Sequence, residues 1–279
     1  ANMGYKVIVF GGAGFLGSHV VDELKARGHE VTVFDLKDSP TRTIMNDNSV
    51  EHAMAGCDVV YNFAGEADIS RSKKFPRDTF LLNVLGNLNI LDAAKKAGIK
   101  RFVYASTVYV FSKKGSFYGI SKQTAERCVE EYQIPYTILR YGTVYGPGAD
   151  EKNRIYRMIK EALAKTEINF DGSGLEEREF IHVKDAARLS VDVLDDKYEN
   201  KHVLLTGNER TSYQSLMNMI AEILGWPPDC DLNKSHYNTT PYSYRPNESL
   251  KLMANPYIDL GQGLLETIED ISDRLKSKS

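Results

Sequence analysis

The sequence lacks the features that mark membrane-spanning and nucleic-acid-binding proteins. Its apolar runs are only a few residues long, so none of them is expected to span a bilayer as a helix. Lys and Arg total 35 against 38 Asp and Glu, which gives a net charge of −3. This balance gives no electrostatic reason to expect a nucleic acid or an anionic membrane surface as partner.

Cysteine is scarce as well. Cys57, Cys128 and Cys230 are an odd number and show no CxxC spacing, which argues against both a disulfide framework and a zinc site. Strand-like residues begin almost at once, so we expect no secretory signal. The sequence therefore predicts a cytoplasmic protein without a bound metal.

The chain has 279 residues, of which 42% are apolar, enough for cores in about two lobes. Its first half alternates β-rich runs with helical patterns. The strands are expected at 5–10, 30–34, 58–63, 101–105 and 136–139, and the helices at 15–27, 79–97 and 119–132. This order predicts an α/β fold, a doubly wound parallel sheet with right-handed crossovers.

Two stretches are short for such a sheet. Residues 36–48 leave no room for a crossover helix and a further strand. Either the sheet lacks a strand here or residues are missing between Ser39 and Met45, and the helix start expected at Asn48 favours the second explanation. The segment 112–117 is also shorter than this architecture normally needs. Later helices are expected at 153–165, 185–194, 212–224 and 264–276 in a smaller second lobe.

Three glycines, Gly11, Gly14 and Gly17, lie between the first strand and the first helix. Gly11 permits a tight turn, Gly14 lets the backbone approach a diphosphate, and Gly17 allows close packing of helix on strand. The diphosphate would sit at the helix N-terminus, where free N–H groups favour an anion. The alternative is a simple tight turn.

Asp35 ends the second strand and strengthens the cofactor interpretation. An acid at this place accepts both ribose hydroxyls of adenosine and repels the 2′-phosphate of NADP. Lys37 is the nearby cation that would weaken this discrimination. The pattern therefore favours NAD over NADP.

Tyr118 and Lys122 are four residues apart, so they share one face of a helix. A cation beside a phenol stabilises the phenolate, which suits acid–base chemistry on an alcohol. Ser106 and Thr107 follow the strand before this helix, at the sheet edge where open α/β sheets bind ligands.

The motifs GGAGFLG, VFD, VVYNFAG, NVLGNLNILDAA, LRYGTVYGPG and REFIHVKDAA occur in this order. The chain thereby resembles an extended short-chain dehydrogenase/reductase of the NAD-dependent epimerase/dehydratase family. The resemblance implies a Rossmann NAD-binding domain over 1–145, with a possible return segment near 178–206. It implies a smaller C-terminal α/β substrate-binding lobe, mainly over 146–279.

The resemblance also implies roles for single residues. Thr107 would hydrogen-bond the reacting sugar oxygen, Tyr118 would act as the general base, and Lys122 would hold the nicotinamide ribose and tune Tyr118. Asn83 would anchor the following helix and a water near the lysine. The cofactor-binding residues so implied are Gly11, Gly14, Phe15, Leu16, Gly17, Asp35, Leu36, Phe63, Ala64, Gly65, Asn83, Ala105, Ser106, Tyr118, Lys122, Tyr141, Gly142 and Val144.

For the substrate, the resemblance points to Thr107, Thr143, Arg178 and Arg245. The arginines would bind the diphosphate of a nucleotide sugar, since a planar guanidinium suits bidentate contacts. Thr143 replaces the family's Asn, which puts the usual contact there in doubt. Val108 and Tyr109 replace the Asp-Glu pair of the dehydratases and disfavour 4,6-dehydration, and residues 105–117 carry no Cys for a 3,5-epimerase. His182 is expected to be structural.

We therefore expect an NAD-dependent nucleotide-sugar enzyme with hydride transfer at sugar C4, foremost a 4-epimerase. A nucleotide-sugar 4-dehydrogenase or 4-keto reductase is the alternative; a small-carbonyl reductase or a non-catalytic NAD-binding regulator fits less well. The apolar helices near 80–97 and 119–132 predict a homodimer through a four-helix bundle, as is common in the family. Burial of both helices in the packing against the sheet is the other explanation.

Overall fold

The computed structural model describes residues 4–37, 43–226, 233–235 and 250–279. They form two compact units. The first contains the described residues within 1–141, 187–205 and 244–252, and the second those within 142–186, 206–243 and 253–279.

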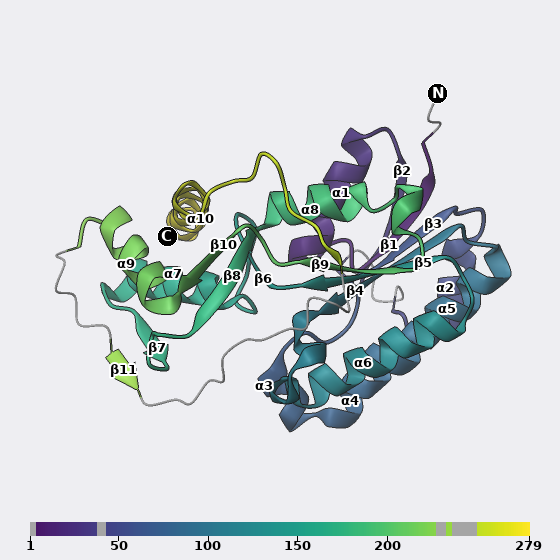
Figure 1. Cartoon of the computed structure of the whole chain (residues 1–279), viewed down its shortest axis with the longest axis horizontal. Coiled ribbons are helices and arrows are strands. Elements are labelled where there is room, and N and C mark those ends of the chain that lie inside the picture. The colour runs from purple at the N-terminus through teal and green to yellow at the C-terminus, as the bar shows by residue number, and fades with distance from the viewer. Residues whose placement is uncertain (1–3, 38–42, 227–232, 236–249) are drawn as a thin grey trace. The chain divides into compact units, whose positions relative to one another are not determined.

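A seven-stranded parallel sheet forms the centre of the first unit (Figure 1). Its strands are β1 (Lys6–Phe10), β2 (Glu30–Phe34), β3 (Val59–Asn62), β4 (Arg101–Thr107), β5 (Tyr136–Tyr141), β9 (Lys201–Leu205) and β12 (Leu250–Lys251). The order β12-β9-β5-β4-β3-β1-β2 places β1 between β2 and β3, so the chain winds in both directions from β1. Ligands of open α/β sheets bind at the carboxyl ends of the strands near such a reversal.

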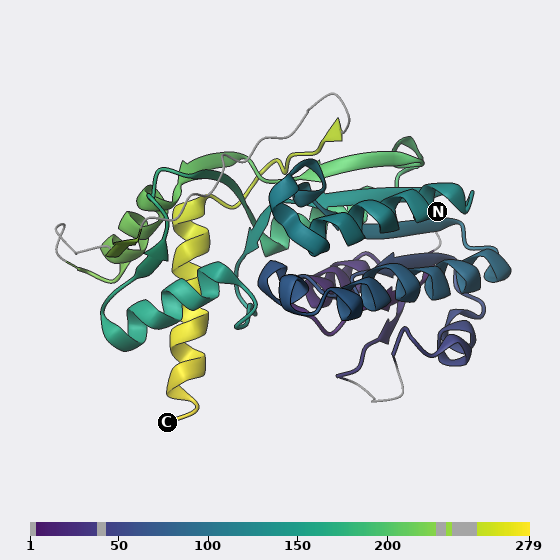
Figure 2. The same ribbon diagram turned by 90° about the horizontal axis from the view of Figure 1, so that it is seen from below.

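Helices cover both faces of this sheet, as Figures 1 and 2 show. One face carries α1 (Phe15–Ala26) and the later part of α8 (Val183–Asp192), where Arg27 pairs with Asp192 at 2.7 Å. The other face carries α2 (Asp47–Met54), α5 (Gly86–Ala97) and α6 (Ser116–Glu131). Ile8, Phe10 and Phe102 are fully buried under these three helices. The alternate strand residues Val7 and Val9 are buried as well, so both faces of the sheet are apolar.

β4 and β5 are two residues longer than the sequence predicts. Ser106 and Thr107 continue the ladder of β4, opposite Arg140 and Tyr141 of β5. The polar residues pair like the apolar ones because the register of the backbone hydrogen bonds is already set by the strand. The two hydroxyls are therefore held on a rigid element rather than in a loop.

The short segment after β2 leads directly to α2. Asn46 caps this helix by accepting a hydrogen bond from the Ser49 backbone N–H at 3.1 Å, two residues earlier than the expected start. The described residues between Phe34 and Asp47 contain no strand, and β2 lies at the edge of the sheet. Residues 38–42, where part of the suspected gap falls, lie outside the described residues.

The expected helix over 79–97 is three elements in the structure. These are α4 (Pro76–Phe80), a π-helical turn (Leu81–Leu85) and α5. Before them lies α3 (Ile69–Lys74), and two 3₁₀ turns (Val108–Phe111 and Lys113–Gly115) connect β4 to α6. π turns are rare and frequently occur at functional sites.

The second unit contains the strands β6 (Thr143–Tyr145), β8 (Glu177–His182) and β10 (Glu209–Ser212) in the order β10-β8-β6. A two-stranded ribbon joins β7 (Asn169–Asp171) to β11 (Asn233–Ser235). The helices are α7 (Arg154–Lys165), α9 (Tyr213–Ile223), α10 (Leu260–Lys276) and the start of α8; a last 3₁₀ turn of the first unit spans Asp196–Tyr198. No helix in the described part of the chain has the length and apolar character needed to cross a membrane.

Candidate active site

The loop after β1 is shaped so that only glycine fits at two of its positions. Gly11 has a φ of +75°, and a Cβ on it would lie 2.8 Å from the carbonyl carbon of Phe63. A Cβ on Gly17 would lie 2.3 Å from the Gly11 oxygen. The loop thus lies close against β3 and α1, and no side chain caps α1 at Gly14. The first N–H groups of α1 are those of Phe15, Leu16 and Gly17, and a helix N-terminus of this kind suits a diphosphate.

Asp35 is fixed beside this loop. Its Oδ2 accepts a hydrogen bond from the Ala13 N–H at 3.0 Å, and its Oδ1 accepts one from the Lys37 N–H at 2.9 Å. The Lys37 ammonium is bound to the Ala13 carbonyl at 3.2 Å, and Leu36 is exposed. A carboxylate held at the end of β2 fits the ribose hydroxyls of an adenosine and disfavours a phosphate in their place. The residues present therefore fit NAD.

The candidate catalytic residues meet at the carboxyl end of β4. The Tyr118 hydroxyl is hydrogen-bonded to Thr107, whose Oγ1 also accepts from the Tyr109 N–H at 3.2 Å. The Lys122 ammonium donates to the Ala105 carbonyl at 3.0 Å and lies 4.9 Å from the centre of the Tyr104 ring. The residues that the sequence predicts to act together are thus brought together by one strand and one helix.

Burial dominates the electrostatics of this group. It raises the pKa of Tyr118 to about 12, although the hydrogen bond with Thr107 acts in the opposite direction. It lowers the pKa of Lys122 to about 8, against the attraction of Glu126. Tyr118 and Lys122 lie one helical turn apart on α6, and a cation that approaches a buried phenol favours release of its proton.

The segment after β3 forms the side of this site that faces the glycine loop. The Phe63 N–H donates to the Phe10 carbonyl at 2.8 Å, and the Ala64 N–H donates to the Asn62 side chain at 3.0 Å. A Cβ on Gly65, which has a φ of +138°, would collide with Asn83. Phe63, Ala64 and Gly65 are thereby held close to the turn after β1.

Asn83 lies in the π-helical turn and connects this segment to α6. Its Oδ1 accepts from the Glu66 N–H at 2.8 Å, and its Nδ2 donates to the Glu66 carbonyl at 3.0 Å and to Ser121 Oγ at 2.9 Å. The extra residue of a π turn re-aims a side chain. Through its hydrogen bond with Ser121, Asn83 contacts the residue that directly precedes Lys122 in the chain.

The remaining predicted residues are distributed over both units. In the first, the Tyr141 hydroxyl is 2.5 Å from Ser190 Oγ, and burial raises the pKa of this tyrosine. In the second, Gly142 lies against Thr206, while Thr143 and Val144 pair with Phe180 and Ile181 of β8.

Arg178 also belongs to the second unit, on β8. It donates to the Glu177 carbonyl at 2.8 Å and stacks 5.9 Å from the Tyr213 ring centre. Arg245 lies outside the described residues. His182 is buried, 3.2 Å from Glu266, in agreement with a structural role.

The model of the NAD dependent epimerase/dehydratase family matches residues 7–206, most of the chain. The chain belongs to this family. Family membership confirms the predicted fold class and the resemblance to an extended short-chain dehydrogenase/reductase. It also confirms the expectation that the chain is an enzyme with NAD as its cofactor.

Several members are similar over most of their length. An uncharacterised UDP-glucose epimerase of Bacillus subtilis is 28% identical, over 79% of this chain and 82% of its own. UDP-glucuronic acid decarboxylase 1 of Arabidopsis thaliana is 26% identical, over 97% and 70%. The crystal structure of a Thermotoga maritima UDP-glucose 4-epimerase with UDP-glucose is 25% identical, covers 97% of this chain and 99% of that one, and has a TM-score of 0.82.

The structure adds residues to this family member's site that the sequence analysis did not name. Ser72, fully buried on α3, accepts a hydrogen bond from the Tyr118 N–H at 3.1 Å. Glu126, one turn beyond Lys122 on α6, accepts one from Ser106 at 2.5 Å. An acid on the buried face of α6 and an arginine, Arg140, in the apolar strand YTILRY were signals available in the sequence.

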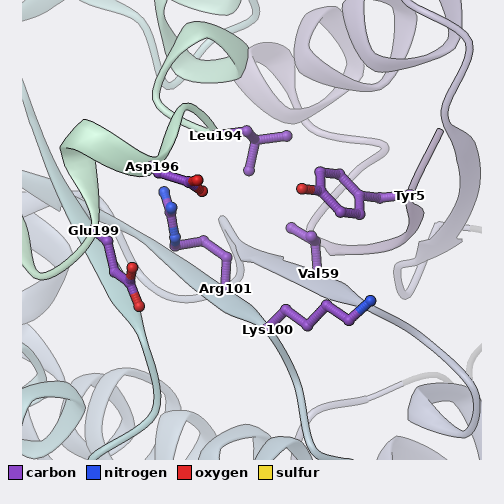
Figure 3. Close-up of a pocket in the computed structure, with 7 residues that line it drawn as sticks. All are labelled: Tyr5, Val59, Lys100, Arg101, Leu194, Asp196 and Glu199. Carbon is purple, nitrogen blue, oxygen red and sulfur yellow. The ribbon is translucent and has the colours of Figure 1, made fainter. Parts of the chain in front are cut away.

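A cavity of about 170 Å³ lies at the opposite ends of the strands (Figure 3). It is lined by residues that precede or begin β1, β3, β4 and β9, namely Tyr5, Val59, Lys100, Arg101, Leu194, Asp196 and Glu199. Ligands of open α/β sheets bind at the carboxyl ends of the strands, so this cavity is separate from the NAD site of the family member.

Proposed function

We propose that this chain is an NAD-dependent nucleotide-sugar 4-epimerase. The observation that carries the proposal is the hydrogen-bonded Thr107–Tyr118 pair, with Lys122 one helical turn away, on the sheet that bears the glycine loop. The names of the Bacillus subtilis and Thermotoga maritima relatives, a UDP-glucose epimerase and a UDP-glucose 4-epimerase, support the same reaction on a UDP-sugar.

The residues divide the chemistry among them. NAD, when bound, supplies the acceptor for the hydride of sugar C4. Tyr118 takes the proton of the C4 hydroxyl while Thr107 holds the same oxygen, and the Lys122 ammonium stabilises the phenolate and holds the nicotinamide ribose. If the resulting 4-ketone rotates in the site, the bound cofactor would supply the hydride to its other face. Tyr118 would return its proton to the C4 oxygen, so the C4 epimer would form with no net change in NAD.

Product analysis decides between this proposal and its alternatives. UDP-glucose incubated with the protein and NAD is expected to yield UDP-galactose by NMR, with no net absorbance at 340 nm. Net NADH formation would instead identify a 4-dehydrogenase, and NADH consumption with a 4-keto sugar nucleotide a reductase. Loss of carbon dioxide from UDP-glucuronate would point to the chemistry named for the Arabidopsis thaliana relative.

We propose that the first unit binds NAD and that the second binds the sugar nucleotide, partly through Arg178. Arg178→Ala is expected to weaken UDP binding by about tenfold, because a guanidinium–phosphate contact is worth roughly 1.5–3 kcal/mol. Calorimetric titration with UDP measures the effect. Arg210→Ala, which removes an exposed arginine from the neighbouring strand β10, is the matched control. Unchanged UDP affinity in Arg178→Ala would favour a reductase of small carbonyl compounds.

We further propose a homodimer through the helices near 80–97 and 119–132. Leu81, Leu85, Phe117 and Ile120 on these elements are each 40–51% exposed, and large apolar side chains clustered at a surface mark an interface. Ile120→Glu is therefore expected to halve the mass measured by light scattering. Leu265→Glu on α10, also at an exposed leucine, is expected to leave the mass unchanged. A wild-type monomer would overturn this proposal.

A cytoplasmic location and a part in carbohydrate biosynthesis belong to the same proposal. Both follow from the proposed activity on a nucleotide sugar, an activated form in which cells supply sugar residues. Fractionation of cells and detection of the epimer pair in extracts are the corresponding measurements.

A further inference from the structure

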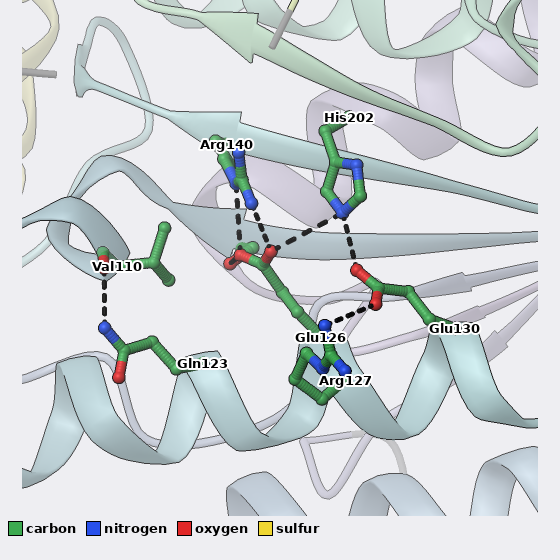
Figure 4. Close-up of polar contacts among 8 residues, drawn as sticks. Val110, Gln123, Glu126, Arg127, Glu130, Arg140 and His202 are labelled. Atoms are coloured by element: carbon green, nitrogen blue, oxygen red, sulfur yellow. Dashed lines mark hydrogen bonds and ion pairs between the residues drawn. The ribbon is translucent and has the colours of Figure 1, made fainter. Parts of the chain in front are cut away.

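A buried polar cluster lies at the contact of α6 with β4 and β5, one helical turn beyond Lys122 (Figure 4). Its centre is Glu126, which is only 4% exposed. Arg140 donates to this carboxylate twice, from Nη2 at 2.7 Å and from Nε at 3.3 Å. Ser106 Oγ donates to Glu126 Oε2 at 2.5 Å. His202 Nε2 lies 3.9 Å from the Glu126 Oε1 and 2.8 Å from Glu130.

The cluster joins the elements that surround Thr107. Ser106 precedes Thr107 on β4, and Arg140 lies opposite Ser106 on β5. The guanidinium of Arg140 also stacks 4.7 Å from the Phe111 ring, in the 3₁₀ turn that follows Thr107. One carboxylate therefore fixes the strand end and, through Arg140, the turn after it.

Stability alone does not account for a charge pair at this place. Taking a carboxylate and a guanidinium out of water costs several kcal/mol per ion before their attraction is counted. An apolar pair of similar volume is often equally stable or more stable. The apolar packing of α5 and α6 on the same sheet shows that such a solution is available here.

The charge of Glu126 has a specific neighbour. Lys122 lies one helical turn before it, and burial lowers the pKa of this lysine to about 8 while Glu126 raises it. The other groups around the ammonium are the Ala105 carbonyl and the Tyr104 ring from β4. Tyr118 lies one helical turn before Lys122 on α6.

We infer that Glu126 is a positioning residue of the active site, which keeps the Lys122 ammonium charged and holds Ser106, and with it Thr107, in place for the reaction. The inference rests on the proposed function in one respect, that Tyr118 acts with a cationic lysine beside it. Glu126 itself does not touch substrate or NAD. It acts through Lys122 on charge and through Ser106 on geometry.

Glu126→Gln tests the effect on charge, because the amide keeps the shape and removes the negative charge. Without Glu126 the lysine loses its proton at lower pH, so the alkaline limb of the kcat profile moves to lower pH. The expected shift is about half a pH unit or more. A profile that coincides with that of the wild type would overturn the inference.

Glu130→Gln is the matched control on the same helix. Glu130 binds His202 and Arg127 at the edge of the cluster and is only partly buried. We expect the alkaline limb of the kcat profile of Glu130→Gln to match that of the wild type. Glu126→Asp, which keeps the charge, is expected to restore the limb toward the wild-type position. An equal shift in Glu130→Gln would show that any loss of negative charge on α6 suffices, against the inference.

Glu126→Gln removes the carboxylate charge that faces the buried Arg140 guanidinium, which is expected to lower stability. The double variant Glu126→Gln/Arg140→Gln forms a neutral amide pair instead, and the limb is expected to move in the same direction. Ser106→Ala removes only one hydrogen bond and tests geometry. Its kcat is expected to fall about tenfold at an unchanged alkaline limb, since small displacements of reacting groups are costly. A kcat equal to that of the wild type would overturn the geometric role.

NAD affinity separates this inference from the proposed function. Lys122 is proposed to hold the nicotinamide ribose, so NAD binding measured by calorimetry is expected to weaken at alkaline pH, and at lower pH in Glu126→Gln. This holds whichever sugar is the substrate. Lack of turnover with all UDP-sugars would reject the epimerase, while an NAD profile unaffected by Glu126→Gln would reject the role of Glu126.

Discussion

Arg101 and Thr107 stand at the two ends of β4, and both are about 95% buried. Arg101 donates to two backbone carbonyls and one side-chain hydroxyl: Nη1 binds the Val193 carbonyl at 2.6 Å and Thr137 Oγ1 at 3.2 Å, and Nη2 binds the Asp195 carbonyl at 3.5 Å. Thr107 is bound instead to the hydroxyl of Tyr118, a group that can gain or lose a proton.

This difference distinguishes the amino ends of the strands, which we expect to be structural, from the carboxyl ends, where we propose that the chemistry takes place. At the amino end, Arg101 lies beside the acids Asp196 and Glu199 at the cavity of Figure 3, while the Lys100 ammonium points away from them and pairs with Asp58 at 3.6 Å. Charges of both signs are therefore close together. At the carboxyl end, burial raises the pKa of Tyr118 to about 12 and lowers the pKa of Lys122 to about 8. Titratable groups whose pKa values are strongly shifted by burial cluster at functional sites.

Tyr118→Phe is the strongest test of this comparison. Removing the hydroxyl takes away the proposed general base, so kcat is expected to fall by about 10³–10⁴-fold while NAD still binds. Steady-state kinetics and calorimetric NAD binding measure the two effects. Tyr132→Phe, at the far end of α6, removes a hydroxyl that binds Asp92 and serves as the control. Near-normal turnover in Tyr118→Phe would mean that the carboxyl end of β4 is not the chemical one.

Arg101→Met tests the structural end. The carbonyls of Val193 and Asp195 lose their donor, so the free energy of unfolding is expected to fall by about 2–3 kcal/mol. Urea denaturation measures the loss, and kcat per folded molecule is expected to stay within about twofold. Lys100→Met is the control, because its exposed ion pair with Asp58 at 3.6 Å contributes little. A large loss of kcat without a loss of stability would make the amino end functional.

The sequence predicts the carboxyl end better than the amino end. Gly11, Gly17 and Asp35 were predictable because backbone space and ribose recognition each demand one residue type. Tyr118 and Lys122 were predictable because helical spacing puts them on one face. The pairing of Arg101 with the turn after α8 was not predictable, because the partners in that turn are backbone carbonyls about 90 residues away. Every residue has a backbone carbonyl, so no residue type indicates such a partner.

The π turn around Asn83 shows the same limit. An apolar run over 79–97 predicts one continuous helix, and one inserted backbone residue changes its hydrogen bonds but not its pattern. Glu126 was visible as an acid four residues after Lys122, yet its importance depends on Ser106 and Arg140, which are brought to it only by the register of β4 and β5.

Asp35→Asn gives the smallest expected effect and sharpens the comparison at the carboxyl edge. The amide keeps the acceptor for the Ala13 N–H but loses the charge that attracts ribose hydroxyls and repels a 2′-phosphate. NAD affinity is expected to fall about fivefold and NADP affinity to rise, because hydrogen bonds to a charged group exceed neutral ones by roughly 1 kcal/mol. Titrations with both dinucleotides measure this. Asp22→Asn, an exposed acid on α1, makes the same change in net charge and is expected to alter neither affinity. If it altered both equally, Asp35 would act through net charge, and the fixed carboxylate at the end of β2 would not select the cofactor.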